Sequence, residues 1–300
     1  MKILITGANG QLGQDLQRRF AAENAEIVAL DRQNLDIADP QAVRDSIAHH
    51  NPNILINAGA YTAVDKAESE PDLAYAANTT APKILAEAAA TQNVTFVHIS
   101  TDYVFDGKQS TPYQETDPTN PIGVYGKSKR DGEIAIAQVG QTQDLRYCIL
   151  RTAWVYGNYG KGNFVKTMLR LGAQREELRV VADQIGTPTW TYDIADAIAQ
   201  LLSSPDWENG IYHFTNSGAA SWYDFAIAIF EEAQALKIPL TLQNVVPITT
   251  PEYPTPAQRP AYSVLATAKI RAFLASPPPQ WRVSLRKMLA QLTDGEFEGL

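Results

Sequence analysis

Tyr125 and Lys129 stand four residues apart in a stretch of the chain that is favourable for a helix. On a helix, residues i and i+4 share a face, so a phenol and an ammonium group would lie side by side. A free tyrosine has a pKa of about 10, and a nearby cation favours phenolate and lowers that pKa. Such a pair can protonate a carbonyl oxygen while a hydride reaches the carbonyl carbon. Because chance often produces this spacing, the interpretation needs support from other residues.

A hydroxyl group that could hold the same oxygen comes from an earlier part of the chain. Residues 97–102 form a buried strand pattern that ends in Ser100, Thr101 and Asp102. Thr101 is therefore the third candidate for the catalytic group. His98, in the same strand, is interpreted as a core residue.

A glycine pattern at the start of the chain supports the interpretation that Tyr125 and Lys129 act together with a cofactor. Gly7, Gly10 and Gly13 follow the first strand pattern and open a helix pattern. Glycines permit a tight turn and let the backbone approach a diphosphate, and the helix adds unpaired N–H groups and the positive end of its dipole. This context between a strand and a helix makes a dinucleotide-binding turn credible.

Cofactor choice stays open. Asp31 ends the second strand pattern, where a carboxylate can accept hydrogen bonds from the adenosine ribose. Arg32 follows it and could pair with a 2′-phosphate, although an ordinary surface arginine explains it equally well. We therefore expect NADP(H), NAD(H) or both. Asp36 and Ile37 lie where an adenine ring could be held, and the small residues of 57–62 end the third strand beside the cofactor.

These side chains must be positioned by an alternation of strands and helices. Strands are expected at residues 2–6, 26–30, 53–57, 94–100 and 145–151, with helices at 11–23, 41–49, 72–91 and 124–138 between them. Nearly continuous apolar strands are typical of a parallel sheet covered on both faces. Later helices are expected at 164–171, 192–202 and 221–234, and strands at 178–182 and 211–215. Residues 247–260 are rich in proline and are expected to be irregular.

The predicted fold is an α/β, Rossmann-type doubly wound parallel sheet with a smaller substrate-binding lobe from the C-terminal half. The dinucleotide-binding domain is expected at 1–155, with later returns near 178–215, and the substrate-binding lobe mainly at 156–300. Trp222, at a helix start, is interpreted as a packing residue. The acidic end at 294–298 is expected to be a solvated tail.

Composition narrows the classes of protein. The 300 residues carry a net charge of −8 without a Lys/Arg run, which argues against nucleic acid or an anionic membrane as a partner. Cys148 is the one cysteine, so no disulfide forms within the chain. No apolar stretch reaches the roughly 20 residues that span a bilayer. We expect a cytoplasmic protein.

The chain resembles the extended short-chain dehydrogenase/reductase superfamily and, within it, the dTDP-4-dehydrorhamnose reductase family. The resemblance covers nearly the whole chain and rests on residues 6–13, 57–68, 100–107, 125–129 and 151–157. It implies NAD(P)H-dependent reduction of the 4-keto group of dTDP-4-dehydro-L-rhamnose to dTDP-L-rhamnose. Related dehydratases carry a glutamate where this chain has Tyr103, so elimination is disfavoured and reduction remains.

The resemblance also implies roles for individual residues. Tyr125 would donate the proton, Lys129 would lower its pKa and hold the nicotinamide ribose, and Asn78 resembles the structural asparagine of the active site. The implied cofactor contacts are Gly7, Gly10, Gln11, Leu12, Gly13, Asp31, Arg32, Asp36, Ile37, Ala58, Ala60, Thr62, Tyr125 and Lys129. The implied substrate contacts are Thr101, Asp102, Tyr125, Trp154 and Arg259.

Two other functions compete with this hypothesis. One is another sugar-nucleotide reductase or epimerase of the superfamily, and the other is a non-catalytic regulatory subunit that binds nicotinamide. Retention of Thr101, Tyr125 and Lys129 favours an enzyme. The chain is expected to be a monomer or a homodimer, and magnesium is possible, but its ligands cannot be assigned.

Overall fold

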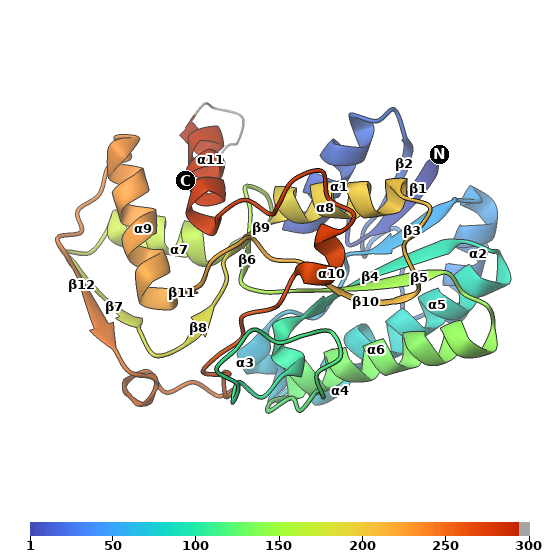
Figure 1. Ribbon diagram of the computed structural model, residues 1–300, viewed down its shortest axis with the longest axis horizontal. Coiled ribbons are helices and arrows are strands. Elements are labelled where there is room, and N and C mark those ends of the chain that lie inside the picture. Colours follow the sequence, from blue (N-terminus) through green and yellow to red (C-terminus); the bar gives the residue numbers. More distant parts are fainter. Residues whose placement is uncertain (294–300) are drawn as a thin grey trace.

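A six-stranded parallel sheet forms the centre of the larger part of the molecule (Figure 1). The computed structural model describes residues 1–293, so the acidic end at 294–298 lies outside the described residues. The strand order is β10-β5-β4-β3-β1-β2. The bounds are β1 (Lys2–Thr6), β2 (Glu26–Leu30), β3 (Ile54–Asn57), β4 (Thr95–Thr101), β5 (Tyr147–Thr152) and β10 (Gly210–His213). The predicted α/β fold class is confirmed.

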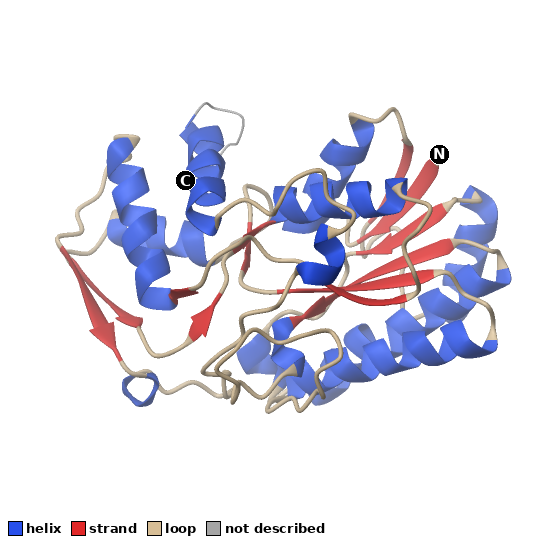
Figure 2. Cartoon of the chain, viewed as in Figure 1, coloured by secondary structure: helices blue, strands red, loops and turns tan. Residues whose placement is uncertain are grey.

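Helices cover both faces of this sheet, which is why its strands are apolar on both sides (Figure 2). On one face α1 (Gln11–Ala21) packs against α8 (Thr191–Ser203), and both bury aliphatic side chains with Ile3, Ile5 and Leu150. On the other face lie α2 (Pro40–His50), α5 (Ala81–Thr91) and α6 (Val124–Thr142). The sheet is therefore packed on both faces, and the ends of its strands can hold the side chains of a site in fixed positions.

The helix expected at 72–91 is divided into three segments. They are α4 (Pro71–Tyr75), the π-helical turn η1 (Ala76–Thr80) and α5. Pro82 has no backbone N–H to donate to the carbonyl four residues before it, which favours the wider turn at this point. The turn brings the Asn78 carbonyl against α6, where a Cβ on Gly132 would lie only 2.1 Å from the Asn78 oxygen. Close packing here requires a glycine.

The second half builds a separate packed cluster beside the sheet. Its helices are α7 (Phe164–Gly172), α9 (Trp222–Ala235) and α11 (Trp281–Thr293), and its strands β7 (Glu177–Val181) and β12 (Asn244–Ile248) pair in parallel. The start of the proline-rich segment thus belongs to a strand, and α11 was not anticipated. Of the elements near 178–215, β10 joins the large sheet and α8 packs over it, whereas β7 does not. The domain boundary at residue 155 stays a prediction.

The remaining elements are short. They are α3 (Val64–Ala67), η2 (Asp102–Val104), β6 (Val155–Tyr156), β8 (Ile185–Gly186), β9 (Thr189–Trp190), β11 (Ala220–Ser221), η3 (Thr250–Glu252) and α10 (Ala268–Arg271). β6 pairs with β9 directly after β5 leaves the large sheet. The chain therefore crosses between the two parts just beyond Thr152.

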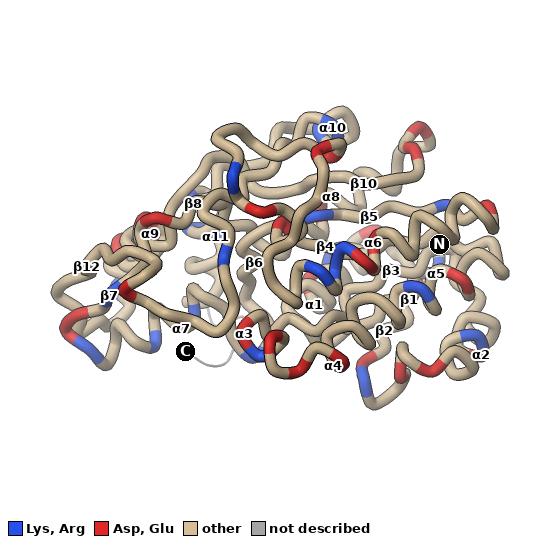
Figure 3. Tube along the Cα trace, turned by 90° about the horizontal axis from the view of Figure 1, so that it is seen from below, with Lys and Arg blue, Asp and Glu red and all other residues tan. Residues whose placement is uncertain are grey.

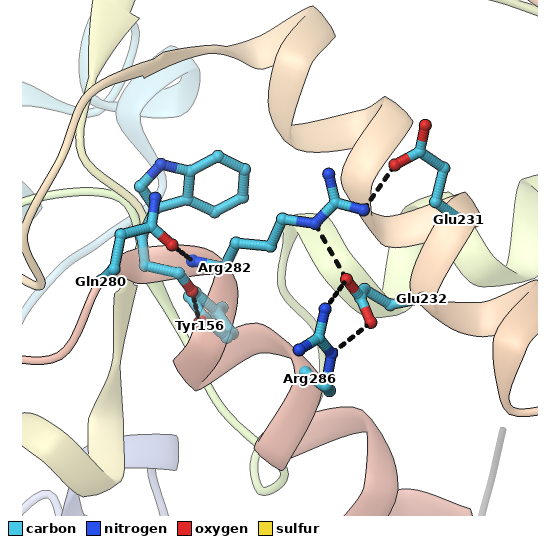
Figure 4. A network of polar contacts seen from close by, with 7 residues as sticks. Tyr156, Glu231, Glu232, Gln280, Arg282 and Arg286 are labelled. Atoms are coloured by element: carbon cyan, nitrogen blue, oxygen red, sulfur yellow. Dashed lines mark hydrogen bonds and ion pairs between the residues drawn. The ribbon is translucent and has the colours of Figure 1, made fainter.

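An ion network ties α9 to α11 (Figure 4). Arg282 and Arg286 both bind the Glu232 carboxylate, at 2.8 and 2.7 Å, and Arg282 also contacts Glu231. These arginines hold the pKa of Glu232 below its ordinary value.

Elsewhere Lys and Arg are interspersed with Asp and Glu along the trace (Figure 3). Within residues 1–293, no helix is both long and apolar enough to cross a bilayer.

Candidate active site

A cavity of about 1250 Å³ runs along the carboxyl ends of the central strands. Ligands of open α/β sheets bind at this edge. Its wall includes the glycine turn, residues 152–155, residues 160–164 and Trp222, and Asn163 Nδ2 donates to Gln11 Oε1 beside the turn at 3.2 Å. The predicted site residues in its wall are Gly7, Gly10, Gln11, Leu12, Asp31, Arg32, Ala58, Ala60, Thr62, Thr101, Asp102, Tyr125, Lys129 and Trp154. One cavity therefore brings together both ends of the predicted chemistry.

The glycine turn has no room for side chains. Gly7 has φ +69°, and a Cβ there would lie 2.5 Å from the Gly59 nitrogen. A Cβ on Gly13 would lie 2.3 Å from the Gly7 oxygen, so Gly13 closes the turn from within rather than lining the cavity. Gly10 caps α1 without a side-chain hydrogen bond, which leaves first-turn N–H groups available to an anion. This backbone cradle fits a dinucleotide diphosphate.

We expect Gly7→Ala to lower the free energy of unfolding by roughly 1–3 kcal/mol and to weaken NADPH binding, because alanine is strained at positive φ and collides with Gly59. Thermal unfolding and a fluorescence titration with NADPH measure the two effects. Gly162→Ala is the matched control, since Gly162 lines the same cavity but a Cβ there meets nothing within 4 Å. Equal behaviour of the two variants would contradict the assignment of the turn.

Asp31 and Arg32 differ in hydrogen bonding and exposure at the part of the cavity where we expect the adenosine. The Asp31 carboxylate accepts hydrogen bonds from Asn9 Nδ2 at 2.5 Å and from the Gln33 amide at 2.9 Å. Arg32 is exposed and lines the cavity. Asp36 accepts a hydrogen bond from the Ala38 amide and Ile37 lies near Gly59, and neither residue is part of the cavity wall.

Thr101 and Tyr125 meet at the centre of the cavity. The Thr101 hydroxyl donates to Asp102 Oδ1 at 2.9 Å and accepts from the Tyr103 amide. Burial raises the pKa of Tyr125 to about 12; the Thr101 hydroxyl opposes this shift and the charge of Asp102 adds to it. Burial dominates this shift, and the predicted lowering of the Tyr125 pKa by Lys129 stays a prediction. A phenol with this pKa is protonated near neutral pH, as a proton donor must be.

Lys129 is buried below Tyr125 on the same helix. Its Nζ lies 2.6 Å from the Ile99 oxygen and 3.1 Å from His98 Nε2. Burial lowers the pKa of Lys129 to about 8, and Glu133 opposes that shift. His98 is a buried residue of β4, as predicted, but its contact with the active-site amine was missed. Its position in the strand that ends at Ser100 was the available signal.

The substrate end contains unpaired polar atoms and two tryptophans. Asp102 Oδ2 and Thr152 Oγ1 are buried and have no hydrogen-bond partner among the described residues. Burial raises the pKa of Asp102 to about 6. Trp154 adopts φ +48° and stacks on Trp222, with ring centroids 3.6 Å apart. The interpretation of Trp222 as a packing residue was incomplete, because it also lines the cavity.

Asn78 and Arg259 lie behind the cavity wall. Asn78 exchanges hydrogen bonds with the Tyr61 backbone and donates to Ser128 Oγ at 3.1 Å, which ties the loop after β3 to α6. Arg259 forms an ion pair with Asp65 at 2.8 Å. Burial raises the pKa of Tyr103, a residue of the wall, and the charge of Arg259 opposes that shift, so Arg259 lies close to the cavity without lining it.

Metal ligands are not grouped in this site. Among the described residues, no cluster of three or more His, Cys, Asp or Glu side chains could hold a metal ion. The magnesium possibility gains no support in this part of the chain.

Comparison with known proteins places this geometry in a family. Residues 1–294 match the model of the RmlD substrate binding domain. The dTDP-4-dehydrorhamnose reductase of Aggregatibacter actinomycetemcomitans is 46 % identical over 294 residues, covering 96 % of this chain and 98 % of the relative. A probable dTDP-4,6-dihydroxy-2-methyloxan-3-one 4-ketoreductase of Streptomyces antibioticus is 42 % identical, covering 99 % of this chain and 97 % of the relative.

A solved structure matches along the same length. The dTDP-4-dehydrorhamnose reductase of Bacillus anthracis, crystallised in complex with NADP, superposes with a TM-score of 0.88 at 39 % identity and covers 97 % of this chain and 99 % of its own. The range matched by the family model includes both the glycine turn and the tyrosine helix. The chain belongs to the RmlD family of dTDP-4-dehydrorhamnose reductases, within the extended short-chain dehydrogenase/reductase superfamily.

Proposed function

We propose that this chain reduces the 4-keto group of dTDP-4-dehydro-L-rhamnose to give dTDP-L-rhamnose, with NADPH or NADH as the reductant. The observation that carries the proposal is one cavity whose wall contains Thr101, Tyr125 and Lys129 together with the glycine turn. Full-length relatives at more than 40 % identity carry the same activity in their names. A nicotinamide cofactor, when bound, supplies the hydride.

The side chains supply the proton and the orientation. Tyr125 donates the proton of its phenol to the O4 atom as negative charge grows on that oxygen. The Thr101 hydroxyl holds the same oxygen, and Asp102, which also lines the cavity, contacts a sugar hydroxyl. Trp154 and Trp222 offer a flat apolar wall against which the deoxysugar packs. Lys129 holds the nicotinamide ribose, and Arg259, released from its ion pair with Asp65, binds the substrate diphosphate.

A second candidate function is reduction of a different dTDP-linked 4-keto sugar. The relative from Streptomyces antibioticus favours it, because that name also describes a 4-ketoreductase of a dTDP-sugar. Both candidates use the same proton donor, so the catalytic residues do not separate them. The two candidate substrates would differ in how the sugar packs against Asp102 and Trp154.

A competition among substrates tests the choice. Absorbance at the reduced-nicotinamide band is followed with dTDP-4-dehydrorhamnose and with other dTDP- and UDP-linked 4-keto sugars. We expect the largest kcat/KM for dTDP-4-dehydrorhamnose. A higher value for another sugar favours the second candidate, and NADPH binding without oxidation of any of them favours the non-catalytic subunit. An epimerase would keep its cofactor bound and show no net oxidation.

Arg32 is expected to select for NADPH. We predict that Arg32→Ala lowers kcat/KM for NADPH by about 10- to 150-fold and leaves NADH nearly unchanged, because a hydrogen bond to a charged group is worth about 1.5–3 kcal/mol. Steady-state rates with both cofactors measure the change. Arg44→Ala is the control, since Arg44 lies on α2 and hydrogen-bonds Gln41 outside the cavity wall. If both cofactors lose rate equally in Arg32→Ala, Arg32 does not read the 2′-phosphate.

A further inference from the structure

A row of hydrogen-bonded side chains crosses three strands beneath the cavity. Thr6, Asn57 and His98 are register partners in β1, β3 and β4. Thr6 Oγ1 donates to Asn57 Oδ1 at 2.7 Å, Asn57 Nδ2 lies 3.0 Å from His98 Nδ1, and all three residues are buried. The row continues to Lys129 through His98 Nε2. It therefore joins the residue before Gly7 to the amine of the active site.

The orientation of the Asn57 amide is fixed by the backbone. The Gly59 N–H donates to Asn57 Oδ1 at 3.1 Å, and a backbone N–H cannot accept a hydrogen bond. The oxygen of the amide must therefore face Gly59 and Thr6. Its Nδ2 group, which is a donor, must face His98.

This orientation fixes the tautomer of His98. Because Asn57 Nδ2 donates, His98 Nδ1 must be the acceptor and carries no proton. The proton of the neutral ring is then on Nε2, which faces Lys129 Nζ. Two donors would oppose each other at 3.1 Å if Lys129 were an ammonium ion. A neutral amine resolves the conflict, since it donates to the Ile99 oxygen and accepts from His98.

The charges around the pair agree with a neutral amine. Glu133, one helical turn beyond Lys129 on α6, is bound by the Arg151 guanidinium at 2.7 Å and needs no second cation. Tyr125, one helical turn before Lys129 on α6, is protonated near neutral pH. Burial lowers the pKa values of both His98 and Lys129.

We propose that His98 is a positioning residue that donates its Nε2–H to the unprotonated amine of Lys129 in the cofactor-free enzyme, with Asn57 fixing that tautomer from the side of the glycine turn. Lys129 is then an acceptor poised to take up a proton, rather than a permanent cation. Because Thr6 precedes Gly7, the same row links the cofactor-binding turn to the proton state of the amine. The inference rests on Lys129 being the active-site amine of the proposed function.

Nitrogen NMR of the full-length, cofactor-free protein tests the tautomer directly. With ¹⁵N-labelled histidine, the His98 ring should show a protonated Nε2 and an unprotonated Nδ1 from about pH 6 to 9, since its pKa lies well below the ordinary value. The resonance is assigned by its loss in His98→Gln. A protonated Nδ1, or a doubly protonated ring in this range, would overturn the proposal.

The titration of Lys129 supplies the second measurement. With ¹⁵N-labelled lysine, Nζ of Lys129 should titrate near the pKa of about 8, and His98→Leu should move the midpoint upward by roughly one unit or less, because the neutral amine loses its donor. His98→Gln retains an N–H in the place of Nε2 and should restore the midpoint. An unchanged midpoint in His98→Leu contradicts the proposal.

His213→Gln is the control for the burial of a polar side chain. His213 is a buried histidine of β10 that faces Arg151 and the Tyr113 carbonyl instead of Lys129. The His213→Gln variant should leave the midpoint of the Lys129 titration unchanged. A shift equal to that of His98→Leu would instead indicate a general loosening of the sheet. Neither NMR measurement needs turnover, so failure of the proposed function and failure of this inference are distinguishable.

Discussion

Replacing Tyr125 with phenylalanine lowers kcat by about 10²–10⁴-fold, the usual contribution of a general acid, and leaves the affinity for NADPH nearly unchanged. The ring would keep its edge-to-face packing with Tyr103, whose centroid is 5.5 Å away, so the shape of the wall is retained. Only the proton donor to O4 is removed. Initial rates and an NADPH titration of the same preparation measure the two quantities.

Tyr212→Phe is the matched control for this variant. Tyr212 is a buried tyrosine whose hydroxyl donates to the Glu208 carbonyl at 2.8 Å, outside the cavity wall. Its loss should cost about 1 kcal/mol of stability without changing kcat. A normal rate for Tyr125→Phe would remove Tyr125 as the proton donor, and a comparable loss in both variants would indicate a general effect of deleting a buried hydroxyl.

Arg151→Met is expected to lower the free energy of unfolding by about 3–5 kcal/mol, because it leaves the Glu133 carboxylate buried without its partner. The guanidinium contacts both Glu133 oxygens, at 2.9 and 2.7 Å, and the two side chains are only 2 % and 3 % exposed. Ser100 Oγ also donates to Glu133 at 2.5 Å, so the pair anchors the end of β4 that presents Thr101. Chemical denaturation measures the loss.

A double variant tests whether stability is lost because one charge is left buried alone, rather than because the ion pair itself is missing. Arg151→Met with Glu133→Leu should recover most of the stability, since replacing a buried ion pair by apolar groups is often nearly neutral. The Ser100 hydroxyl, left without its partner, keeps the recovery incomplete. Lys83→Met, which removes an exposed partner of Glu87, should change stability by no more than about 1 kcal/mol. If Arg151→Met were as mild as Lys83→Met, the buried pair would not hold the strand end.

The sheet could be predicted from the sequence because each strand is marked by local composition. The apolar run at residues 2–6 is buried on both faces, and Gly7 and Gly13 stand where a turn has no space for a Cβ. The site residues at strand ends followed from the same rule, since carboxyl ends of parallel strands share one edge. Local pattern and fold therefore agree for the cofactor half of the cavity.

Contacts between residues far apart in the sequence could not be predicted from local composition. Strand composition does not give register, so the alignment of Asn57 with His98, and the approach of His98 to Lys129, emerged only from the fold. Trp222 enters the cavity because Trp154 adopts a left-handed backbone and turns its ring onto it, which no spacing rule predicts. The raised pKa of Tyr125 has the same origin, because burial depends on how the two halves pack.

The most direct measurement of the central claim is the stoichiometry of a complete reaction. Purified protein is mixed with NADPH and a limiting amount of dTDP-4-dehydrorhamnose, the loss of the reduced-nicotinamide absorbance is recorded, and the sugar product is identified by NMR. The structure predicts one NADPH oxidised for each dTDP-L-rhamnose formed, and no oxidation in Tyr125→Phe over the same time. Retention of all the NADPH by the wild-type protein while the cofactor binds normally, or its oxidation without a reduced C4 in the sugar, would contradict the account.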